Sequence, residues 1–219
     1  MKQQFIINER RERLLLFFAG WGMDETPFLH IYPKETDWMV CSDYRTLDFD
    51  DEQISQYKEI TVIGWSMGVW AAAQVMQKHP ELPIKQRIAI NGTLFPIHET
   101  LGIAPAIYEG TLQRLNEVTL QKFQRRMCGS STAYRSYLNI APMRSIESLK
   151  EELVAIRDCS LSTPTPIFLW EKAIIGKMDR IFSPENQERA WSGRAASLQL
   201  IDAPHYQTTL IESTLTNYE

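Results

Sequence analysis

The sequence predicts an α/β fold with a mostly parallel central sheet, and three observations indicate it. Short runs of β-branched and aromatic residues recur along the chain between turn residues, as in strands that are covered on both faces. A serine flanked by glycines separates one of these runs from a helix-forming stretch. In the middle of the chain the strand pattern gives way to helical periodicity, which predicts a helical insertion.

Six segments have the strand pattern, and the connections between the first three are unusual. In chain order the predicted strands are Leu14–Ala19, Trp38–Tyr44, Ile60–Gly64, Arg87–Asn91, Pro166–Trp170 and Leu198–Ile201. The first connection contains two prolines and little helical period, and the second, Arg45–Tyr57, is acidic and similarly weak. Two of the expected crossover helices are therefore predicted to be short or absent.

The helical insertion is predicted to form a lid on the sheet. The predicted division is a core of residues 1–95 and 160–219 and a lid of residues 96–159. Apolar residues recur at helical spacing from Leu112 to Met127, and Gly129 interrupts the pattern. The stretch Ser160–Pro166 (S-L-S-T-P-T-P) is predicted to be the linker that returns the chain to a strand.

Length and composition limit the class of protein. With 219 residues, of which 44% are hydrophobic, the chain can bury the core of one domain. It has no run with the length of a signal peptide or a membrane span, which predicts a soluble, cytoplasmic protein without a membrane partner. The three cysteines have neither C-x-x-C spacing nor a histidine at ligand spacing, so neither a metal site nor a cofactor is expected.

Residues 60–76 (I-T-V-I-G-W-S-M-G-V-W-A-A-A-Q-V-M) have the layout of a nucleophile elbow. Ser66 stands between a strand and a helix, and Gly64 and Gly68 keep Cβ atoms out of the space where the two converge. The N–H groups at the start of the helix point toward the serine, so an oxyanion formed there would meet backbone donors. Such a string also arises by chance in loops, but its flanking strand and helix favour a nucleophile in an α/β-hydrolase fold.

A nucleophilic serine needs a base that takes its proton, and histidine is the usual one. His79 stands at the end of the elbow helix, while His30 and His98 precede the region where the fold places a base. His205 lies in I-D-A-P-H-Y, directly after the last predicted strand, where loops of open parallel sheets collect ligands. A lone loop histidine is more often structural, but its position in chain order makes His205 the predicted base.

The base in turn needs a carboxylate that holds it in one tautomer. Asp179 is the first candidate, because Ser183 and Pro184 behind it have the pattern of an N-cap and first helical residue. That pattern fixes Asp179 in a short loop between a strand and a helix. Glu171 on the strand and Asp202, three residues before the base, are the second and third candidates.

The oxyanion donors are predicted to come from two loops. One is the backbone N–H of Met67, directly after the nucleophile, and the other belongs to the loop after an early strand. That loop begins F-A-G-W-G-M, so Trp21 can turn its N–H inward, and its indole would form one wall of the acyl pocket. The alternative interpretation is that Trp21 is a core aromatic residue at the end of a strand, and this role is compatible with the same position.

The charge of the insertion differs from that of the remaining chain. Residues 111–144 carry six basic side chains and one acid, a net +5, and the whole chain carries −4, which leaves −9 elsewhere. A cationic cap on an acidic protein favours an anionic partner. A solvated helix face is the alternative. The pI of about 5.7 and the lack of a known basic–aromatic module disfavour nucleic acid.

Several strings together resemble one family: F-A-G-W-G, G-W-S-M-G-V-W, A-I-N-G-T, G-K-M-D-R-I-F-S-P and A-P-H-Y, with the basic helical insertion. They are similar to the BioG type of pimeloyl-acyl-carrier-protein methyl ester carboxylesterase, over essentially the whole chain. The resemblance implies an α/β-hydrolase fold with shortened flanking helices. It also implies hydrolysis of the methyl ester of pimeloyl-carrier in biotin biosynthesis.

The resemblance also implies roles for individual residues. The nucleophile, base and acid fall on Ser66, His205 and Asp179, and the oxyanion donors on Trp21 and Met67. A lid aromatic that binds substrate falls on Phe123. The partner is then an acyl carrier protein that bears methyl pimelate, and because such carriers are acidic, basic lid residues are its predicted docking set. That set is Lys122, Arg125, Arg126 and Arg135, of which one or two are expected to pair with core acids.

Two alternatives remain open from the sequence. A general short-chain carboxylesterase or an acyl thioesterase would use the same triad on another acyl group, because positioning decides which carbonyl reaches the serine. A catalytically silent binding module is the alternative from another class. Such a module is expected to have lost a triad member, and this chain retains all three candidates.

Overall fold

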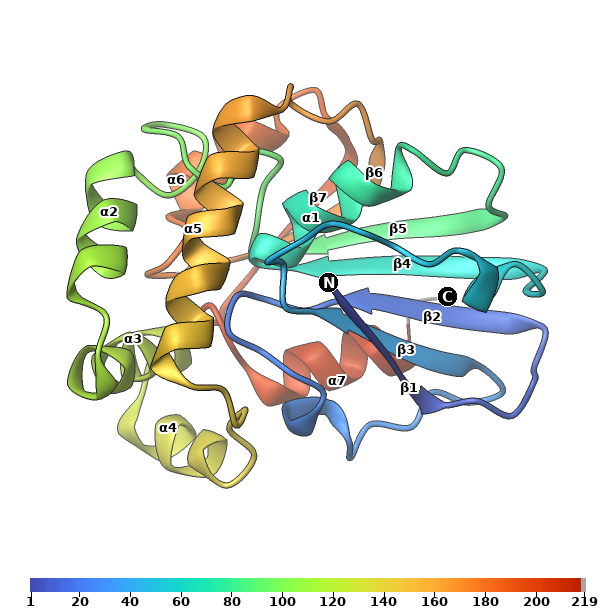
Figure 1. Ribbon diagram of the computed structural model, residues 1–219, viewed down its shortest axis with the longest axis horizontal. Helices are drawn as coiled ribbons and strands as arrows, with labels where there is room; N and C mark the ends of the chain where they lie inside the picture. The colour runs from blue at the N-terminus through green and yellow to red at the C-terminus, as the bar shows by residue number, and fades with distance from the viewer. Residues whose placement is uncertain (218–219) are drawn as a thin grey trace.

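A computed structural model describes residues 1–217 of the protein, and their strands form one twisted sheet (Figure 1). Within these residues the seven strands are β1 (Lys2–Ile7), β2 (Arg13–Phe18), β3 (Asp37–Ser42), β4 (Glu59–Trp65), β5 (Ile84–Ile90), β6 (Trp170–Gly176) and β7 (Ala195–Ile201). Their order is β1-β3-β2-β4-β5-β6-β7. Only the β1–β3 pair is antiparallel, so the predicted α/β fold with a mostly parallel sheet is confirmed.

The helices cover both faces of the sheet and its carboxyl-terminal end (Figure 1). Within residues 1–217 they are α1 (Met67–Met76), α2 (Pro105–Arg114), α3 (Glu117–Cys128), α4 (Ser131–Leu138), α5 (Ile146–Ser162), α6 (Pro184–Trp191) and α7 (Thr208–Thr216). Alternate residues of β2 point to opposite faces: Leu16 joins a buried cluster with the apolar residues of α1, and Leu15 joins one with Ile211 of α7. The strand is therefore apolar throughout, as its sequence indicates.

The first two crossover connections contain no α-helix, as predicted. They hold only the short 3₁₀ segments Thr26–Phe28 and Glu52–Ile54. The outer edge of β3 pairs with β1, which extends the sheet in the antiparallel direction. The sequence pattern did not predict β1, because its alternation of polar and apolar residues is weak.

Two predicted segments around residue 165 were wrong. The linker Ser160–Pro166 begins too early, because α5 continues to Ser162 and its end is held by the Thr163 hydroxyl, which donates to the Cys159 carbonyl at 2.7 Å. The strand Pro166–Trp170 was also misplaced, since the ladder to β7 begins only at Trp170. Pro166 has no N–H for a ladder, and Ile167 is 88% exposed.

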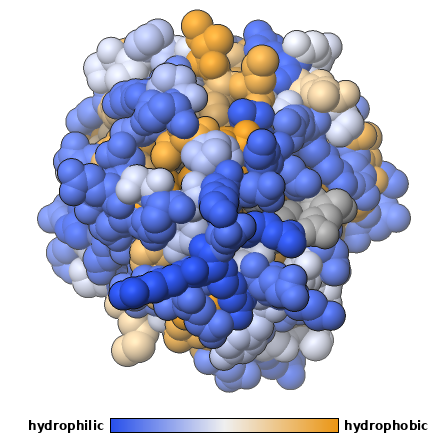
Figure 2. Space-filling view, turned by 90° about the vertical axis from the view of Figure 1, so that its right-hand side faces the viewer, coloured by the Kyte–Doolittle hydropathy of each residue, from blue (hydrophilic) through white to orange (hydrophobic). Residues whose placement is uncertain are grey.

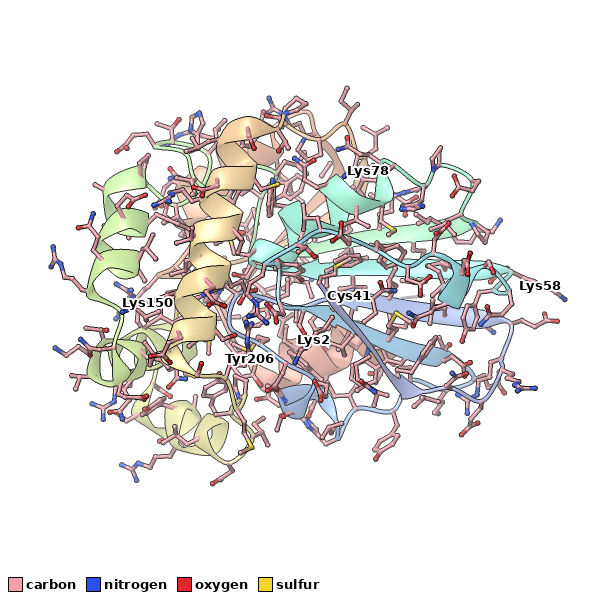
Figure 3. All side chains as sticks on the ribbon, viewed as in Figure 1. Lys2, Cys41, Lys58, Lys78, Lys150 and Tyr206 are labelled. Carbon is pink, nitrogen blue, oxygen red and sulfur yellow. The ribbon has the colours of Figure 1, made fainter. Side chains whose placement is uncertain are left out.

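Helices α2 to α5 lie between β5 and β6 in sequence and gather at the carboxyl ends of the parallel strands (Figure 1). Lys150 on α5 and Lys58 before β4 mark opposite ends of the molecule (Figure 3). The division into a core of residues 1–95 and 160–219 and a lid of residues 96–159 stays a prediction, although α5 crosses its second boundary. The interface between these helices and the strand ends contains the candidate site.

The end of the molecule opposite to these helices has a mainly hydrophilic surface with smaller apolar areas (Figure 2). Loops that lead into the amino ends of the parallel strands form this end (Figure 1). Among the described helices, none has both the length and the apolar character that a membrane span requires.

Candidate active site

Ser66 lies at the turn between β4 and α1, in a conformation that few residues adopt. Its φ is +59° and its ψ is −127°, which is strained for a residue with a side chain. The turn is tight, because a Cβ on Gly68 would lie 2.0 Å from the Phe18 carbonyl oxygen and one on Gly64 would lie 2.8 Å from the Cα of Val69. The predicted reason for the glycines agrees with the backbone geometry at Gly64, whereas Gly68 is needed where α1 approaches the end of β2.

The structure brings three of the predicted site residues together. The His205 ring lies between Ser66 and Asp179, with Nε2 2.9 Å from the serine Oγ and Nδ1 2.8 Å from a carboxylate oxygen. All three residues are buried. Because a carboxylate only accepts hydrogen bonds, His205 donates from Nδ1, and Nε2 is left to accept the serine proton. This is the arrangement in which a serine becomes a nucleophile.

Asp179 is oriented by donors from the loop and helix that follow it. One carboxylate oxygen accepts from the backbone N–H groups of Ile181 at 2.7 Å and Phe182 at 3.0 Å. The other accepts from the Gln187 side chain at 3.0 Å, besides the histidine. The expected N-cap Ser183 accepts from the N–H of Asn186 and starts α6 at Pro184. The carboxylate therefore has a fixed direction toward the ring.

The loop that carries His205 is fixed by two residues for which no role was predicted. Trp65 donates from its indole N–H to the His205 carbonyl at 3.0 Å, and Asn91 donates to the same carbonyl at 2.9 Å. The Asn91 side-chain oxygen also accepts from the Gly176 N–H at 2.7 Å, at the end of β6. Asn91 has a φ of +47°, a conformation that asparagine adopts more readily than most residues. The string A-I-N-G-T, already noted in the sequence, was therefore the available signal for a special role of this residue.

The two other candidate acids lie elsewhere. Asp202 is exposed and pairs with Lys177 at 3.1 Å, and Glu171 at the start of β6 pairs with Arg87 at 3.2 Å. Within residues 1–217, Asp179 is the one carboxylate that pairs with His205.

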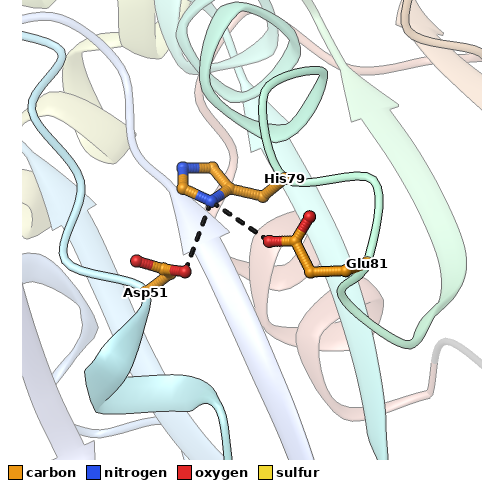
Figure 4. A group of neighbouring side chains, drawn as sticks. All are labelled: Asp51, His79 and Glu81. Atoms are coloured by element: carbon orange, nitrogen blue, oxygen red, sulfur yellow. Dashed lines mark ion pairs between the residues drawn. The ribbon is translucent and has the colours of Figure 1, made fainter.

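The remaining histidines also have other partners. His79 faces Asp51 and Glu81, with its Nδ1 3.5 Å from an oxygen of each (Figure 4). His30 pairs with Glu212 at 2.6 Å, and His98 accepts from a backbone N–H two residues on.

The predicted oxyanion donors line the same cavity as the nucleophile. Met67 is the first residue of α1, so its N–H is among those that have no acceptor within the helix. Trp21 borders the cavity with Ser66 and His205, and its ring meets that of Phe123 edge-on, with centroids 5.1 Å apart. The cavity has about 40 Å³, which is room for a few water molecules.

The predicted docking residues lie on α3 and α4, at the surface. They are Lys122, Arg125, Arg126 and Arg135. Arg125 lies over the Tyr134 ring and Arg126 over the Phe123 ring, at 5.1 and 5.8 Å from the centroids. The expectation that one or two would pair with core acids was wrong for this set within the described residues. A different basic residue of the same segment, Arg144, pairs with one core acid, Asp43, and with Glu152 of α5.

A second groove adjoins the cavity. It has about 350 Å³, and Arg114, Lys122 and Arg126 line it together with apolar residues of α2 and α3. Phe123 and Arg126 line both the groove and the cavity. The groove therefore borders the cavity that contains Ser66.

Residues 1–216 of the chain match the family described as pimeloyl-ACP methyl esterase BioG. The chain belongs to the BioG family. The crystal structure of BioG from Haemophilus influenzae is similar, with 35% identity, a TM-score of 0.86 and 96% of each chain covered. The resemblance found in the sequence is therefore confirmed. A lipase-esterase related protein from Clostridium acetobutylicum shares the fold at 16% identity, with a TM-score of 0.68, 100% of this chain and 99% of that one covered.

A relative from Bacteroides fragilis corrects the predicted reaction. It is 55% identical over 205 residues, 94% of this chain, and is named malonyl-[acyl-carrier protein] O-methyltransferase. The prediction that this chain hydrolyses the methyl ester of pimeloyl-carrier is contradicted by that name, because O-methylation adds a methyl group that hydrolysis removes. The chain spans only 42% of the length of this relative.

Proposed function

We propose that the chain is a serine hydrolase of carboxylic esters, with Ser66 as nucleophile, His205 as base and Asp179 as the acid that orients it. The observation that carries this proposal is the continuous hydrogen-bonded series from Asp179 through His205 to Ser66. Each partner lies within the distance that proton transfer requires. The fold shared with a lipase-esterase related protein is consistent with it.

The proposed reaction follows from the positions of the groups. Ser66 Oγ attacks the ester carbonyl carbon while His205 Nε2 takes its proton. The carbonyl oxygen becomes an oxyanion, which the N–H groups of Met67 and Trp21 stabilise. The C–O bond to the alcohol then breaks, and His205 gives its proton to the leaving oxygen. Water attacks the acyl-serine by the same steps, which releases the acid and restores Ser66.

This set of groups serves acyl transfer rather than methyl transfer. In acyl transfer a serine oxygen attacks a carbonyl carbon, and charge develops on an oxygen beside the attacked atom. Methyl transfer attacks a methyl carbon and develops no such oxyanion. The name of the Bacteroides relative describes a protein more than twice as long as the part that this chain matches.

The proposed substrate is an ester on an acyl chain that an acyl carrier protein presents. Both the family description and the name of the Bacteroides relative refer to an acyl carrier protein. Such a carrier holds its acyl group on a phosphopantetheine arm, which contains a phosphate. The groove between α2 and α3 suits that arm, because Arg114 and Lys122 at the surface offer positive charge for the phosphate. Apolar residues near Phe123 then lead the acyl chain to the cavity. Membership of the BioG family favours a place in biotin synthesis, and the cytoplasmic location stays a prediction.

The proposal is tested with the purified chain in two assays. A fluorophosphonate probe should label Ser66, as peptide mass spectrometry would show, and p-nitrophenyl butyrate should be hydrolysed. A carrier protein loaded with an ester-bearing acyl chain should lose the alcohol while keeping the acyl chain, which intact-mass measurement distinguishes from loss of the whole acyl group. Labelling at another residue with no hydrolysis of either ester would overturn the proposal.

A further inference from the structure

Glu152 of α5 is a fully buried carboxylate that the proposed chemistry does not use. Its side chain has 0% exposure. One oxygen accepts from the backbone N–H of Gly22 at 3.1 Å and from Arg144 at 2.6 Å, and the other accepts from the N–H of Tyr44 at 3.0 Å. Burial of an unpaired carboxylate is strongly unfavourable, so these donors are what allow it there. The carboxylate thus connects α5 to the loops that follow β2 and β3.

A second bond connects the same helix to the same loop. The Trp21 indole donates from Nε1 to the Leu149 carbonyl of α5 at 3.0 Å. Gly22 has a φ of +77°, and a Cβ there would lie 3.1 Å from a methyl carbon of Leu149. Trp21 is therefore fixed by its indole and by the peptide that follows it, and both partners belong to α5.

Arg144 fixes the carboxylate in turn. Its guanidinium pairs with Glu152 and, at 3.0 Å, with Asp43, and its side chain is 7% exposed. It also donates to the Ser148 hydroxyl at 2.7 Å, in the first turn of α5. Glu152 therefore has a charged partner, Arg144, which is itself fixed by Asp43 and Ser148. These contacts fix the position of α5 relative to the Trp21 loop.

We propose that Glu152 is a positioning residue for ester hydrolysis, which holds the Trp21 loop so that the Trp21 N–H is directed at the oxyanion. The inference rests on the proposed function. Oxyanion donors act at about 2.7–3.1 Å from the developing charge, so a small displacement of the loop weakens them. Because α5 belongs to the helical insertion, this part of the insertion builds the site as well as covering it.

The test compares Glu152→Gln with its neighbour Glu151→Gln in the full chain. Glu151 is exposed and pairs with Arg45, so it serves as the matched control. The amide that Glu152→Gln introduces has a single acceptor oxygen, so it cannot accept from both loops and from Arg144 at once. With p-nitrophenyl butyrate we expect kcat to fall about 10- to 100-fold and KM to change less than about twofold, because the donor acts in the transition state. Glu151→Gln should retain both parameters.

A trifluoromethyl ketone gives a readout that a merely structural role would not move. Its adduct with Ser66 carries an oxyanion, so Ki for Glu152→Gln should rise by about the factor by which kcat/KM falls. A lower Tm with unchanged kcat and Ki would overturn the inference. If Glu152→Gln does not fold, Glu152→Asp keeps the charge but draws the carboxylate back by one methylene from the N–H groups of Gly22 and Tyr44, and unchanged kcat and Ki in that variant would likewise overturn the inference. A wild-type chain that neither hydrolyses the ester nor binds the ketone would overturn the proposed function itself.

Discussion

The buried Ser66–His205–Asp179 group and the basic residues of α3 and α4 are held in different ways. In the buried group each side chain has a hydrogen-bond partner at 3.0 Å or less. On the helices, Arg125 and Arg126 lie at the surface over aromatic rings, which hold a charge only loosely. The first region is organised for one arrangement of reacting atoms. The second can adjust to the surface of a partner. Substitutions in the buried group should therefore affect every ester, and substitutions of the basic residues only esters that a carrier presents.

The largest effect is expected from Ser66→Ala. This change removes the nucleophile, and the kcat for every ester should fall on the order of a million-fold. The p-nitrophenyl butyrate assay measures the fall, and the Tm of the variant checks the fold. Near wild-type turnover by a folded Ser66→Ala protein would exclude Ser66 as nucleophile and remove the basis of the comparison.

The next largest effect distinguishes the candidate acids. Asp179→Asn should lower kcat about 10⁴-fold, because an amide can leave His205 in the wrong tautomer. Asp202→Asn should leave kcat within about twofold, since Asp202 is an exposed residue in a surface ion pair. The same assay compares the two purified variants. A greater loss in Asp202→Asn than in Asp179→Asn would move the acid to Asp202.

The sequence predicted the residues of the candidate triad better than the buried charged residues that fix the surrounding loops and helices. Ser66 follows from a local string, and His205 from chain order. Asp179 remained one of three acids, because the contact that selects it joins residues 26 apart in sequence. Glu152 gave no signal, since an acidic residue in a helix is ordinarily exposed. Arg144 was counted as surface charge for the same reason, and only the fold shows that it is buried against Asp43 and Glu152.

The lid offers a test that concerns the carrier-bound substrate alone. Lys122→Glu reverses a charge in the groove without changing a residue of the cavity. The KM for a carrier-bound ester should rise about tenfold, through loss of attraction and added repulsion to an acidic partner. The KM for p-nitrophenyl butyrate should stay the same. Equal losses on both substrates would mean that Lys122 supports the structure of the insertion.

The smallest effect is expected from Arg135→Glu. Arg135 is exposed on α4 and is not among the residues that line the groove, so it can attract a carrier only over distance. Its reversal should raise KM for the carrier-bound ester about twofold, and this difference should vanish near 1 M salt, where screening reduces the reach of charges to about 3 Å. Steady-state kinetics at low and high salt, with Lys122→Glu beside it, measures both effects. An effect of Arg135→Glu that equals or exceeds that of Lys122→Glu would place the carrier over α4 and away from the groove. Indifference of both variants would mean that the basic segment is a solvated surface.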